Sequence, residues 1–467
     1  MTLDDALTIG RLDAHDQAAL VRSREASAAE LVESAIQRAQ ALDPALDAIT
    51  ETAFDMARER AAGGLPDGPM AGVPWLIKDS LDYPGLPSRA GSRSRSGDPV
   101  DREYPFTRIW DAEGLIPLGK SAMPEFGLLP TTEPLLRAPT RNPWSLEHSP
   151  GGSSGGAAAA LAVGIVPLAH GSDGAGSIRI PASCCGVVGL KPGRGASVRV
   201  RGRSVIEDLI VSDVLMSRSV RDTAWAFAAA HPDRPAMVRG PSGGRLRIAF
   251  NLDTLDGGPT DPGVAQVAQR IASLCEDLGH IVEPASPDID RPAALEGMHV
   301  LWAHDGADCV DGVRGSGRDP ASVLEPWTLA LGEMAERLEP ADLERALGQA
   351  ARLPAQFRDF HGRYDVMLTP TLAAPPLKLG EMTATDAPEG LLRRFFEWVG
   401  YTPLQNIAGT PAISLPMGWS DEGLPIGVML AGDRGAEDVL LGLAYELEAA
   451  QPWADRWPEG ARHVSGS

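Results

Sequence analysis

The stretch SPGGSSGGAAAALAVGIVPLAHGSDGAGSIRIP, residues 149–181, places two glycine-rich loops on either side of an apolar run. A Gly-Ser segment such as GGSSGG (151–156) is typical of a flexible linker. A linker would be flanked by polar, solvated sequence. Here an apolar segment of small residues follows at once. Glycine also permits the close approach of other groups and unusual backbone dihedrals. We therefore expect an ordered loop, then a buried helix from Ala157 and a strand over 165–173.

Outward from this stretch, strand-like and helix-like segments alternate along the chain. Apolar runs predict strands at 72–80, 246–250, 281–286 and 364–371, and residues 410–432 predict two strands joined by a turn at Asp421–Gly423. Helical spacing occurs at 27–41, 261–280 and 435–450, and residues 291–363 look mostly helical. This order predicts an α/β fold with a mixed β-sheet core flanked by helices on both faces. Because no repeat or clear linker divides the chain, we expect one large domain over 1–467.

Composition and charge exclude several classes of protein. The 467 residues are 43% hydrophobic and 22% charged, which is typical of a globular chain, and the net charge of −21 argues against nucleic-acid and membrane partners. The acidic N-terminus lacks the features of a signal peptide, and the longest apolar run, Ala157–Ala169, is too short to span a bilayer. The four cysteines show no CxxC spacing, so reduced thiols and a cytoplasmic location are expected.

Several kinds of site are absent from the sequence patterns. The chain lacks a phosphate-binding P-loop, a GxGxxG loop after a strand, GxSxG and HExxH. His299 and His304 are five residues apart and do not stack on one helix face, so no metal site is predicted. The second loop, GSDGAGSIRIP (171–181), offers successive backbone N–H groups beside a serine. Such groups bind anions and suit the oxyanion of an acyl-transfer reaction.

The lysine content singles out a candidate base. Only four of the 42 basic residues are lysine: Lys78, Lys120, Lys191 and Lys378. A chain that uses arginine wherever charge alone matters keeps lysine where an amine must become neutral and accept a proton, although chance survival is the alternative. With no histidine placed beside the loop serines, a serine nucleophile with a lysine base remains.

Five segments carry a family resemblance: GVPWLIKD (72–79), GKSAMPEFG (119–127), SPGGSSGGAAAALA (149–162), GSDGAGSIRIPASCCGVVGLKP (171–192) and AGTPAISLPMG (408–418). In this order they resemble the amidase signature family over nearly the whole chain. The resemblance implies a triad of Ser177 as nucleophile, Ser153 as relay and Lys78 as base, with a cis peptide bond at Gly152–Ser153. It implies no metal or organic cofactor.

The same resemblance assigns supporting roles around the triad. The oxyanion hole would be formed by backbone N–H groups of Gly174, Ala175, Gly176 and Ser177. Asp173 and Arg179 would form an ion pair that holds the loop; the alternative is an ion pair on the surface. Ser154 would support the relay. Ala175 stands where the family more usually has the first glycine of GGSIR. The alanine keeps the backbone N–H group and adds a methyl group.

The remaining segments are expected to select the substrate. The signature core covers about 65–230 and 364–450, and a more variable, mostly helical region covers about 285–363. We expect pocket residues in segments outside the signature, namely Thr131, Thr132, His304 and Tyr401. The loop 193–208, with Arg194, Arg199, Arg201 and Arg203, is either a mobile lid or a solvated loop. Lys120 and Lys191 are expected to be structural, and Lys378 to lie in a solvated loop.

The resemblance implies an amidohydrolase that cleaves aryl, alkyl or cyclic amides through a serine acyl-enzyme. Side activity on esters and carbamates (urethanes) is expected, with a small-molecule substrate and a monomer or homodimer. The segments GSDGAGS and TTEPLLRAPTRNPW look closer to stand-alone hydrolases of nylon oligomers and urethanes. The alternative is a glutamine-hydrolysing subunit of a tRNA-dependent amidotransferase, whose partner would handle the RNA. Because all three triad positions are intact, a non-catalytic scaffold is disfavoured.

Overall fold

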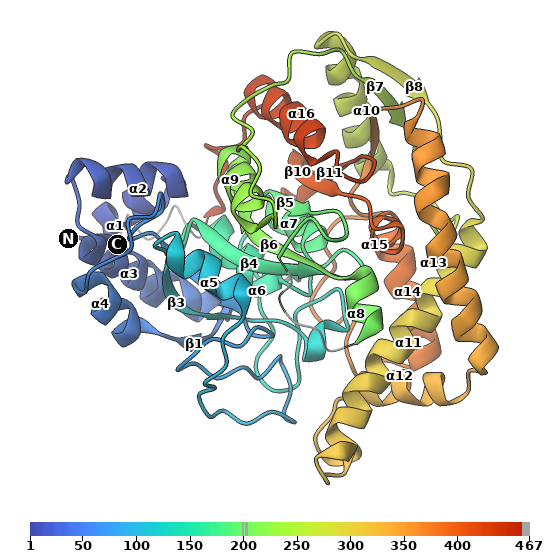
Figure 1. Ribbon diagram of the computed structural model, residues 1–467, viewed down its shortest axis with the longest axis horizontal. Coiled ribbons are helices and arrows are strands. Elements are labelled where there is room, and N and C mark those ends of the chain that lie inside the picture. The colour runs from blue at the N-terminus through green and yellow to red at the C-terminus, as the bar shows by residue number, and fades with distance from the viewer. Residues whose placement is uncertain (199, 201–203, 460–467) are drawn as a thin grey trace.

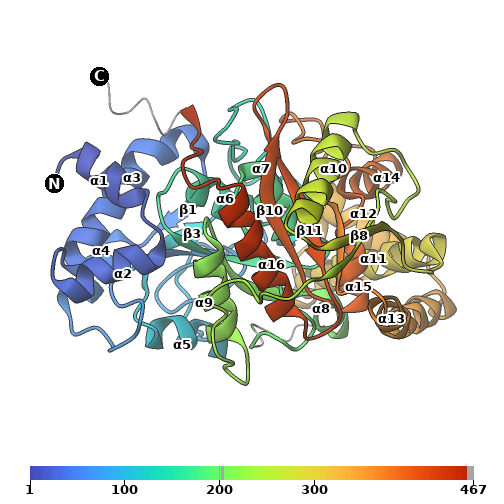
Figure 2. The ribbon, with the colours of Figure 1, turned by 90° about the horizontal axis from the view of Figure 1, so that it is seen from above.

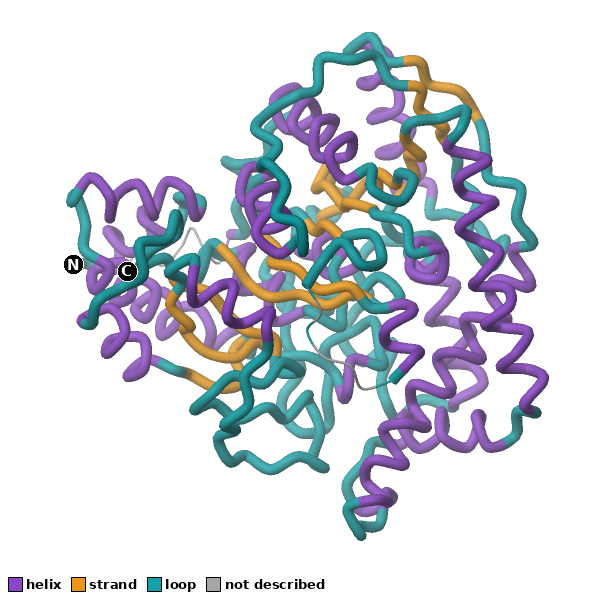
Figure 3. Tube along the Cα trace, viewed as in Figure 1, coloured by secondary structure: helices purple, strands orange, loops and turns teal. Residues whose placement is uncertain are grey.

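Two mixed β-sheets lie at the centre of the fold, as Figure 1 and Figure 3 show for the computed structural model, which describes residues 1–198, 200 and 204–459. The first sheet has the order β1-β3-β2-β4-β6, formed by Ile49–Thr52, Ile116–Ser121, Pro74–Lys78, Leu168–Asp173 and Ser212–Ser217. Its central strand β2 is parallel to both β3 and β4, so these three strands end at the same edge. That edge of a parallel sheet is where binding sites usually form.

The second sheet has the order β5-β10-β11-β9-β7-β8, formed by Gly189–Lys191, Ala412–Trp419, Pro425–Ala431, Val366–Pro370, Arg247–Phe250 and Ile281–Pro284. The hairpin β10–β11 turns where the Gly423 N–H donates to Ser420 O, as the sequence predicts. One isolated bridge, Val188 to Ser217, joins the two sheets. The predicted α/β class is confirmed, and the strands divide between two sheets where the sequence analysis expected one.

Helices cover both sheets and form a separate layer at one end of the molecule. Figure 2 shows α1–α4 at one end and α11–α14 at the other. The N-terminal group comprises Leu3–Gly10 (α1), Ala14–Ser23 (α2), Ala28–Leu46 (α3), Phe54–Ala62 (α4) and Pro105–Ala112 (α5). The layer at the other end comprises Arg291–Gly315 (α11), Pro326–Glu336 (α12), Pro340–His361 (α13) and Pro388–Val399 (α14), with a 3-10 turn, η2, at Pro320–Ser322.

The remaining helices precede or follow strands of the two sheets, and α16 is the last of the described elements. They are Gly155–Ala162 (α6), Arg179–Cys185 (α7), Val205–Ile210 (α8), Val220–Ala230 (α9), Pro262–Asp277 (α10), Pro403–Ala408 (α15) and Glu437–Ala450 (α16), with a 3-10 turn, η1, at Glu125–Gly127.

Local signals account for most of these boundaries. Helix α3 begins after Ser27, whose hydroxyl accepts from the Glu30 N–H while the Glu30 carboxylate accepts from the Ser27 N–H, a capping box. Strands β2, β4, β7, β8 and β9 fall within the predicted segments, and 291–363 is mostly helical as expected. Within the described ranges, no helix combines the length and apolar character needed to cross a bilayer.

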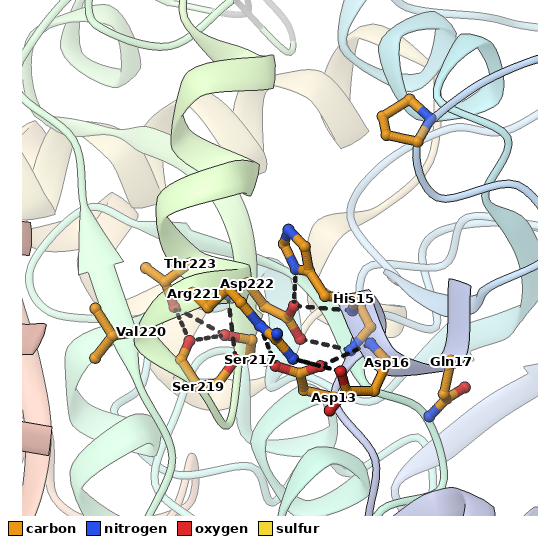
Figure 4. Close-up of polar contacts among 12 residues, drawn as sticks. Asp13, His15, Asp16, Gln17, Ser217, Ser219, Val220, Arg221, Asp222 and Thr223 are labelled. Carbon is orange, nitrogen blue, oxygen red and sulfur yellow. Dashed lines mark hydrogen bonds and ion pairs between the residues drawn. The ribbon is translucent and has the colours of Figure 1, made fainter. Parts of the chain in front are cut away.

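A polar cluster ties α2 to α9 near the N-terminus (Figure 4). The His15 Nδ1 atom lies 2.6 Å from Asp222 Oδ1, and the N–H groups of Ala14 and His15 donate to the two carboxylate oxygens of Asp222 at 2.7 and 3.3 Å. Beside them, Arg221 Nη2 donates to Asp13 Oδ1 at 2.6 Å. Because Asp222 is fully buried, its charge must be compensated by the N–H groups of Ala14 and His15 and by the His15 ring.

The side chains of Asp13, His15 and Asp222 are close enough together to hold a metal ion. However, both oxygens of each carboxylate already accept hydrogen bonds from protein N–H, guanidinium or hydroxyl donors. A cation would have to displace Arg221 from Asp13. The cluster is therefore best described as an ion-paired clamp between two helices.

Replacing the buried carboxylate of this clamp should destabilise the protein. We expect Asp222→Ala to lower the free energy of unfolding by about 2–4 kcal/mol, because two backbone N–H groups and an imidazole lose their acceptor in a buried site. Urea denaturation monitored by circular dichroism measures this. The matched control, Asp16→Ala, removes a carboxylate that is 54% exposed and should cost under about 1 kcal/mol. Equal losses for both variants would contradict the clamp.

Candidate active site

Lys78 is the last residue of β2, and its side chain is fully buried. Its Nζ atom lies 2.7 Å from Ser153 Oγ, 2.9 Å from Ser154 Oγ and 2.8 Å from Ser172 Oγ. Ser153 and Ser154 belong to the first glycine-rich loop, whereas Ser172 lies on the neighbouring strand β4. The sequence analysis identified the first two neighbours and missed Ser172, although it directly precedes Asp173 in the quoted motif.

The first glycine-rich loop is packed against the chain that precedes it. A Cβ atom on Gly152 would lie 2.5 Å from the carbonyl oxygen of Thr131. The Thr132 hydroxyl donates to the Gly151 carbonyl at 2.8 Å. The Gly152–Ser153 peptide bond is cis, as the family resemblance implies. The prediction of an ordered loop is therefore confirmed, and the linker interpretation is wrong.

The two glycine-rich loops are in direct contact. The backbone N–H of Ser154 donates to the carbonyl of Ser177 at 3.2 Å. The exposed fraction falls from 6% at Ser177 to 2% at Ser153 and to zero at Lys78. Ser177 thus lies nearest to solvent and Lys78 deepest in the protein.

Asp173 and Arg179 form a buried ion pair at the second loop. Arg179 Nε donates to Asp173 Oδ2 and Nη2 donates to Oδ1, both at 2.9 Å. Neither side chain is exposed, which excludes the alternative of a surface pair. Burial alone would raise the pKa of Asp173, but the charge and hydrogen bonds of Arg179 lower it to about 2. The carboxylate is therefore ionised near neutral pH.

The backbone N–H groups of the second loop are not equivalent. The Gly176 N–H donates to Asp173 Oδ1 at 2.8 Å. Those of Gly174, Ala175 and Ser177 donate to no residue within the described part of the chain. The prediction of four oxyanion donors therefore fails at Gly176, because the Asp173 carboxylate is the acceptor of that N–H.

Two residues that the sequence motifs did not single out hold this loop: Thr402, which directly precedes α15, and Asn406 within that helix. Thr402 Oγ1 donates to the Ala175 carbonyl at 2.6 Å, and Asn406 Nδ2 donates to the Asp173 carbonyl at 2.8 Å. Asn406 Oδ1 also accepts from Arg179 Nη2 at 2.6 Å. Thr402 and Asn406 are four residues apart, the spacing of one helix face, which is the only sequence signal that links them.

The two threonines predicted to line the pocket lie behind the first loop. Thr131 and Thr132 are fully buried. Their hydroxyls donate to the main-chain carbonyls of Met382, at 2.9 Å, and Gly151, at 2.8 Å. These hydrogen bonds indicate that the two threonines support the loop. The predicted contact of their hydroxyls with substrate differs from this arrangement.

The other two predicted pocket residues lie on or beside different helices. The Tyr401 hydroxyl donates to the Leu252 carbonyl at 3.0 Å, in the connection after β7. It is therefore already engaged within the protein. His304 lies on α11, half-buried, two residues after Trp302.

The other lysines have the positions predicted for them. Lys120 Nζ donates to the Leu81 carbonyl, and Lys191 Nζ donates to the Pro192 carbonyl at 2.8 Å. Burial lowers the pKa of Lys120 to about 8, and burial with the nearby Arg179 charge lowers that of Lys191 to about 7. Lys378 is exposed.

The loop 193–208 is described only in part. Arg199, Arg201 and Arg203 lie outside the described residues, so the lid stays a prediction. Arg194 is described, and its guanidinium donates to the carbonyls of Leu209 and Ile407, both at 2.8 Å. A cavity of about 250 Å³ is lined by residues of 193–198 and Val200 on one side and by residues of 207–213 on the other.

The segment after β3 connects the site to the helical layer. A Cβ on Gly127 would lie 3.0 Å from Ser153 Oγ, so the turn lies against the first loop. The next residue, Leu128, accepts at its carbonyl from the indole N–H of Trp302 at 3.3 Å and of Trp327 at 3.0 Å. Helices α11 and α12 are thus hydrogen-bonded to chain that contacts the site.

Two buried glutamates strengthen the same connection. Glu125 Oε2 accepts from the Glu325 N–H at 2.8 Å and from the Thr328 hydroxyl at 2.6 Å, and its Oε1 accepts from Ser92 Oγ at 2.6 Å. Burial, followed by the charge of Glu125, raises the pKa of Glu325 to about 8. Burial also raises the pKa of Glu125.

Comparison with known proteins gives a consistent result. The family model Amidase matches residues 30–441. A putative amidase, AmiC, of Mycobacterium tuberculosis (strain ATCC 25618 / H37Rv) is 39% identical and covers 97% of each chain. The structure of 6-aminohexanoate cyclic dimer hydrolase complexed with substrate superposes with a TM-score of 0.88 at 32% identity, over 97% of this chain and 99% of that one. A bacterial aryl acylamidase structure gives 0.85 at 27% identity, over 98% and 99%.

The glutamate pair predicts a dependence of stability on pH. Because the folded protein holds a proton on Glu325 that the unfolded chain releases near pH 4.5, the free energy of unfolding should fall as pH rises between about 4.5 and 8. We expect Glu325→Gln to flatten this decline and to be at least as stable as the parent at pH 8.5. Urea midpoints measured from pH 5 to 8.5 give the comparison. Parallel curves for the two proteins would contradict the assignment.

Proposed function

Since the chain belongs to the amidase signature family of amidohydrolases, we propose that it hydrolyses aryl, alkyl and cyclic amides through an acyl-enzyme on Ser177. One observation carries the proposal: Lys78 Nζ lies 2.7 Å from Ser153 Oγ in a fully buried position, and the loop that bears Ser153 touches the loop that bears Ser177. A base, a relay and a nucleophile must lie close together, and these contacts support that proximity.

In the proposed first step, Ser177 Oγ attacks the amide carbonyl carbon and its proton passes to Ser153. Ser153 gives its own proton to the neutral amine of Lys78. A neutral amine has two N–H donors and one lone pair. Lys78 Nζ donates to Ser153, Ser154 and Ser172 at 2.7–2.9 Å. In the proposed reactive state the neutral amine keeps two of these bonds as donor and accepts from Ser153.

The relay then runs in reverse to protonate the departing amine. The C–N bond breaks, the amine leaves with the proton from Lys78 by way of Ser153, and the acyl group stays on Ser177. A water molecule then attacks the acyl carbon while Ser153 takes a proton from the water and passes its own to Lys78. The bond from that carbon to Ser177 Oγ breaks, the proton returns through Ser153 to Ser177 Oγ, and the carboxylic acid leaves. Every proton taken up by Lys78 is returned within one turnover.

The oxyanion formed in each attack needs hydrogen-bond donors. The three N–H groups of Gly174, Ala175 and Ser177 are the candidates, since that of Gly176 is bonded to Asp173. Donors aimed at the developing charge contribute about 10²–10³-fold in rate each. We assign the stabilisation of the tetrahedral intermediate to these three groups.

Apolar side chains beside Gly174 favour an alkyl or aryl substrate. The atoms nearest to the position of a Cβ on Gly174 belong to Val211, Trp302 and Ile210, at 3.2–4.0 Å. An apolar wall would contribute about 25 cal/mol for each Å² of apolar substrate surface it covers. It offers no hydrogen bonds to the polar end of glutamine, so it supports the hydrolase over the glutamine-hydrolysing amidotransferase subunit.

The proposed triad predicts a steep loss of activity on substitution. We expect Ser177→Ala to abolish hydrolysis of a chromogenic anilide, and Lys78→Ala and Ser153→Ala each to reduce kcat by at least about 10²–10³-fold, because triad members act as a unit. Lys378→Ala, which removes an exposed lysine, is the control and should leave kcat unchanged. Near-normal turnover by Lys78→Ala would rule out the mechanism.

A substrate panel separates the candidate functions. We expect amine release from an anilide, an aliphatic amide and a cyclic amide, with side activity on an aryl ester and an aryl carbamate. The carbonyl of a carbamate is less electrophilic than that of an anilide. The rate of carbamate cleavage therefore depends on how well the substrate fits the pocket. Free glutamine, followed by ammonia release, serves as the comparison. Cleavage of glutamine alone would favour the amidotransferase subunit.

A further inference from the structure

One peptide unit of the second loop is held at both of its polar ends. The carbonyl of Ala175 accepts from Thr402 Oγ1 at 2.6 Å, and the N–H of Gly176, the other end of the same peptide, donates to Asp173 Oδ1 at 2.8 Å. A Cβ on Gly176 would lie 2.2 Å from Thr402 Oγ1, so the glycine leaves room for that hydroxyl. The orientation of this peptide plane is therefore fixed by two side chains.

The peptide before Gly174 is held from one side. Asn406 Nδ2 donates to the Asp173 carbonyl at 2.8 Å, and also to Asp173 Oδ1 and the Ile210 carbonyl. In a trans peptide the C=O and N–H groups point in opposite directions. The Gly174 N–H is thus directed away from Asn406, and it has no acceptor within the described part of the chain.

From these contacts we infer that Thr402 and Asn406, one turn apart at α15, are positioning residues for the N–H groups that bind the oxyanion. Neither acts on the substrate. Asn406 directs the Gly174 N–H, and Thr402 locks the Ala175–Gly176 peptide, which fixes the backbone between the Gly174 and Ser177 donors. The inference rests on the proposed function, because it assigns a role within that reaction.

Thr402 offers a matched pair of substitutions. Thr402→Val keeps the shape of the side chain and removes the hydroxyl, whereas Thr402→Ser keeps the hydroxyl. Thr223→Val is the control, because it removes a buried hydroxyl on α9, which is bonded to Ser219 O and Ser217 Oγ. Asn406→Leu tests the second residue, and the Thr402 pair remains decisive if that variant fails to fold.

We expect Thr402→Val to lower kcat for an anilide by about 10–100-fold with KM within about twofold, because misaimed donors weaken transition-state binding more than substrate binding. Thr402→Ser should retain at least about a third of the parental kcat. The affinity for a trifluoromethyl ketone, which forms a tetrahedral adduct on the serine, should fall in parallel with kcat/KM in Thr402→Val.

Hydrogen exchange measured by mass spectrometry gives a readout that does not need turnover. Peptides spanning 173–178 should exchange faster in Thr402→Val than in the parent, Thr402→Ser or Thr223→Val. Unchanged exchange and unchanged kcat in Thr402→Val would overturn the inference, and so would equal losses of kcat in the Val and Ser variants. If parent and Ser177→Ala proteins were equally inactive on every amide, the proposed function would fail, while the exchange data would still decide the role of Thr402.

Discussion

The buried carboxylate of Asp173 is the contact on which the site depends. It accepts from Nε and Nη2 of Arg179, from the Gly176 N–H and from Asn406 Nδ2 on α15. One side chain therefore joins the end of β4, the second loop, the start of α7 and α15. An uncompensated buried charge costs several kcal/mol, so these partners must assemble together. The loop geometry is a consequence of satisfying that charge.

Glycine content in the two loops follows from packing rather than from flexibility. A Cβ on Gly156 would lie 2.4 Å from the Ala48 carbonyl and from the Ala122 N–H, and one on Gly155 would lie 2.2 Å from Thr132 Oγ1. Real Cβ atoms do not approach other atoms so closely, so no larger residue fits without a shift of the backbone. The small residues let α6 enter the core beside β3, which brings Ser153 and Ser154 to Lys78.

The sequence predicted the helices and strands better than it predicted the contacts between them. Lys78 at a strand end and Ser153 and Ser177 in glycine loops were identified from motifs, because local spacing and composition carry them. The division into two sheets was missed, since the three-residue β5 pairs with β10, far along the chain. Thr402 was missed for the same reason: its contact with Ala175 joins residues 227 positions apart. The bond from the Gly176 N–H to Asp173, by contrast, is a local side-chain-to-backbone contact across three residues.

The residues proposed for catalysis lie on different elements from the mostly helical region of about 285–363. Lys78, Ser153 and Asp173 are held by strands of the first sheet and by α6, α7 and α15. Helices α11 and α12 are hydrogen-bonded to the 125–128 segment by the indoles that donate to the Leu128 carbonyl and by the backbone N–H of Glu325, which donates to Glu125. Trp302 of α11 also lies beside Gly174 in the second loop.

These contacts to the turn use one main-chain carbonyl and one carboxylate, and none of them involves a side chain of the proposed triad. Residues of α11 and α12 other than those that bond the turn can therefore change while the turn stays anchored. Because Gly127 lies against Ser153, loss of the anchors would instead disturb the relay. The 125–128 segment is thus one place where helices α11 and α12 are bonded to chain that contacts Ser153, and Trp302 of α11 beside Gly174 is another.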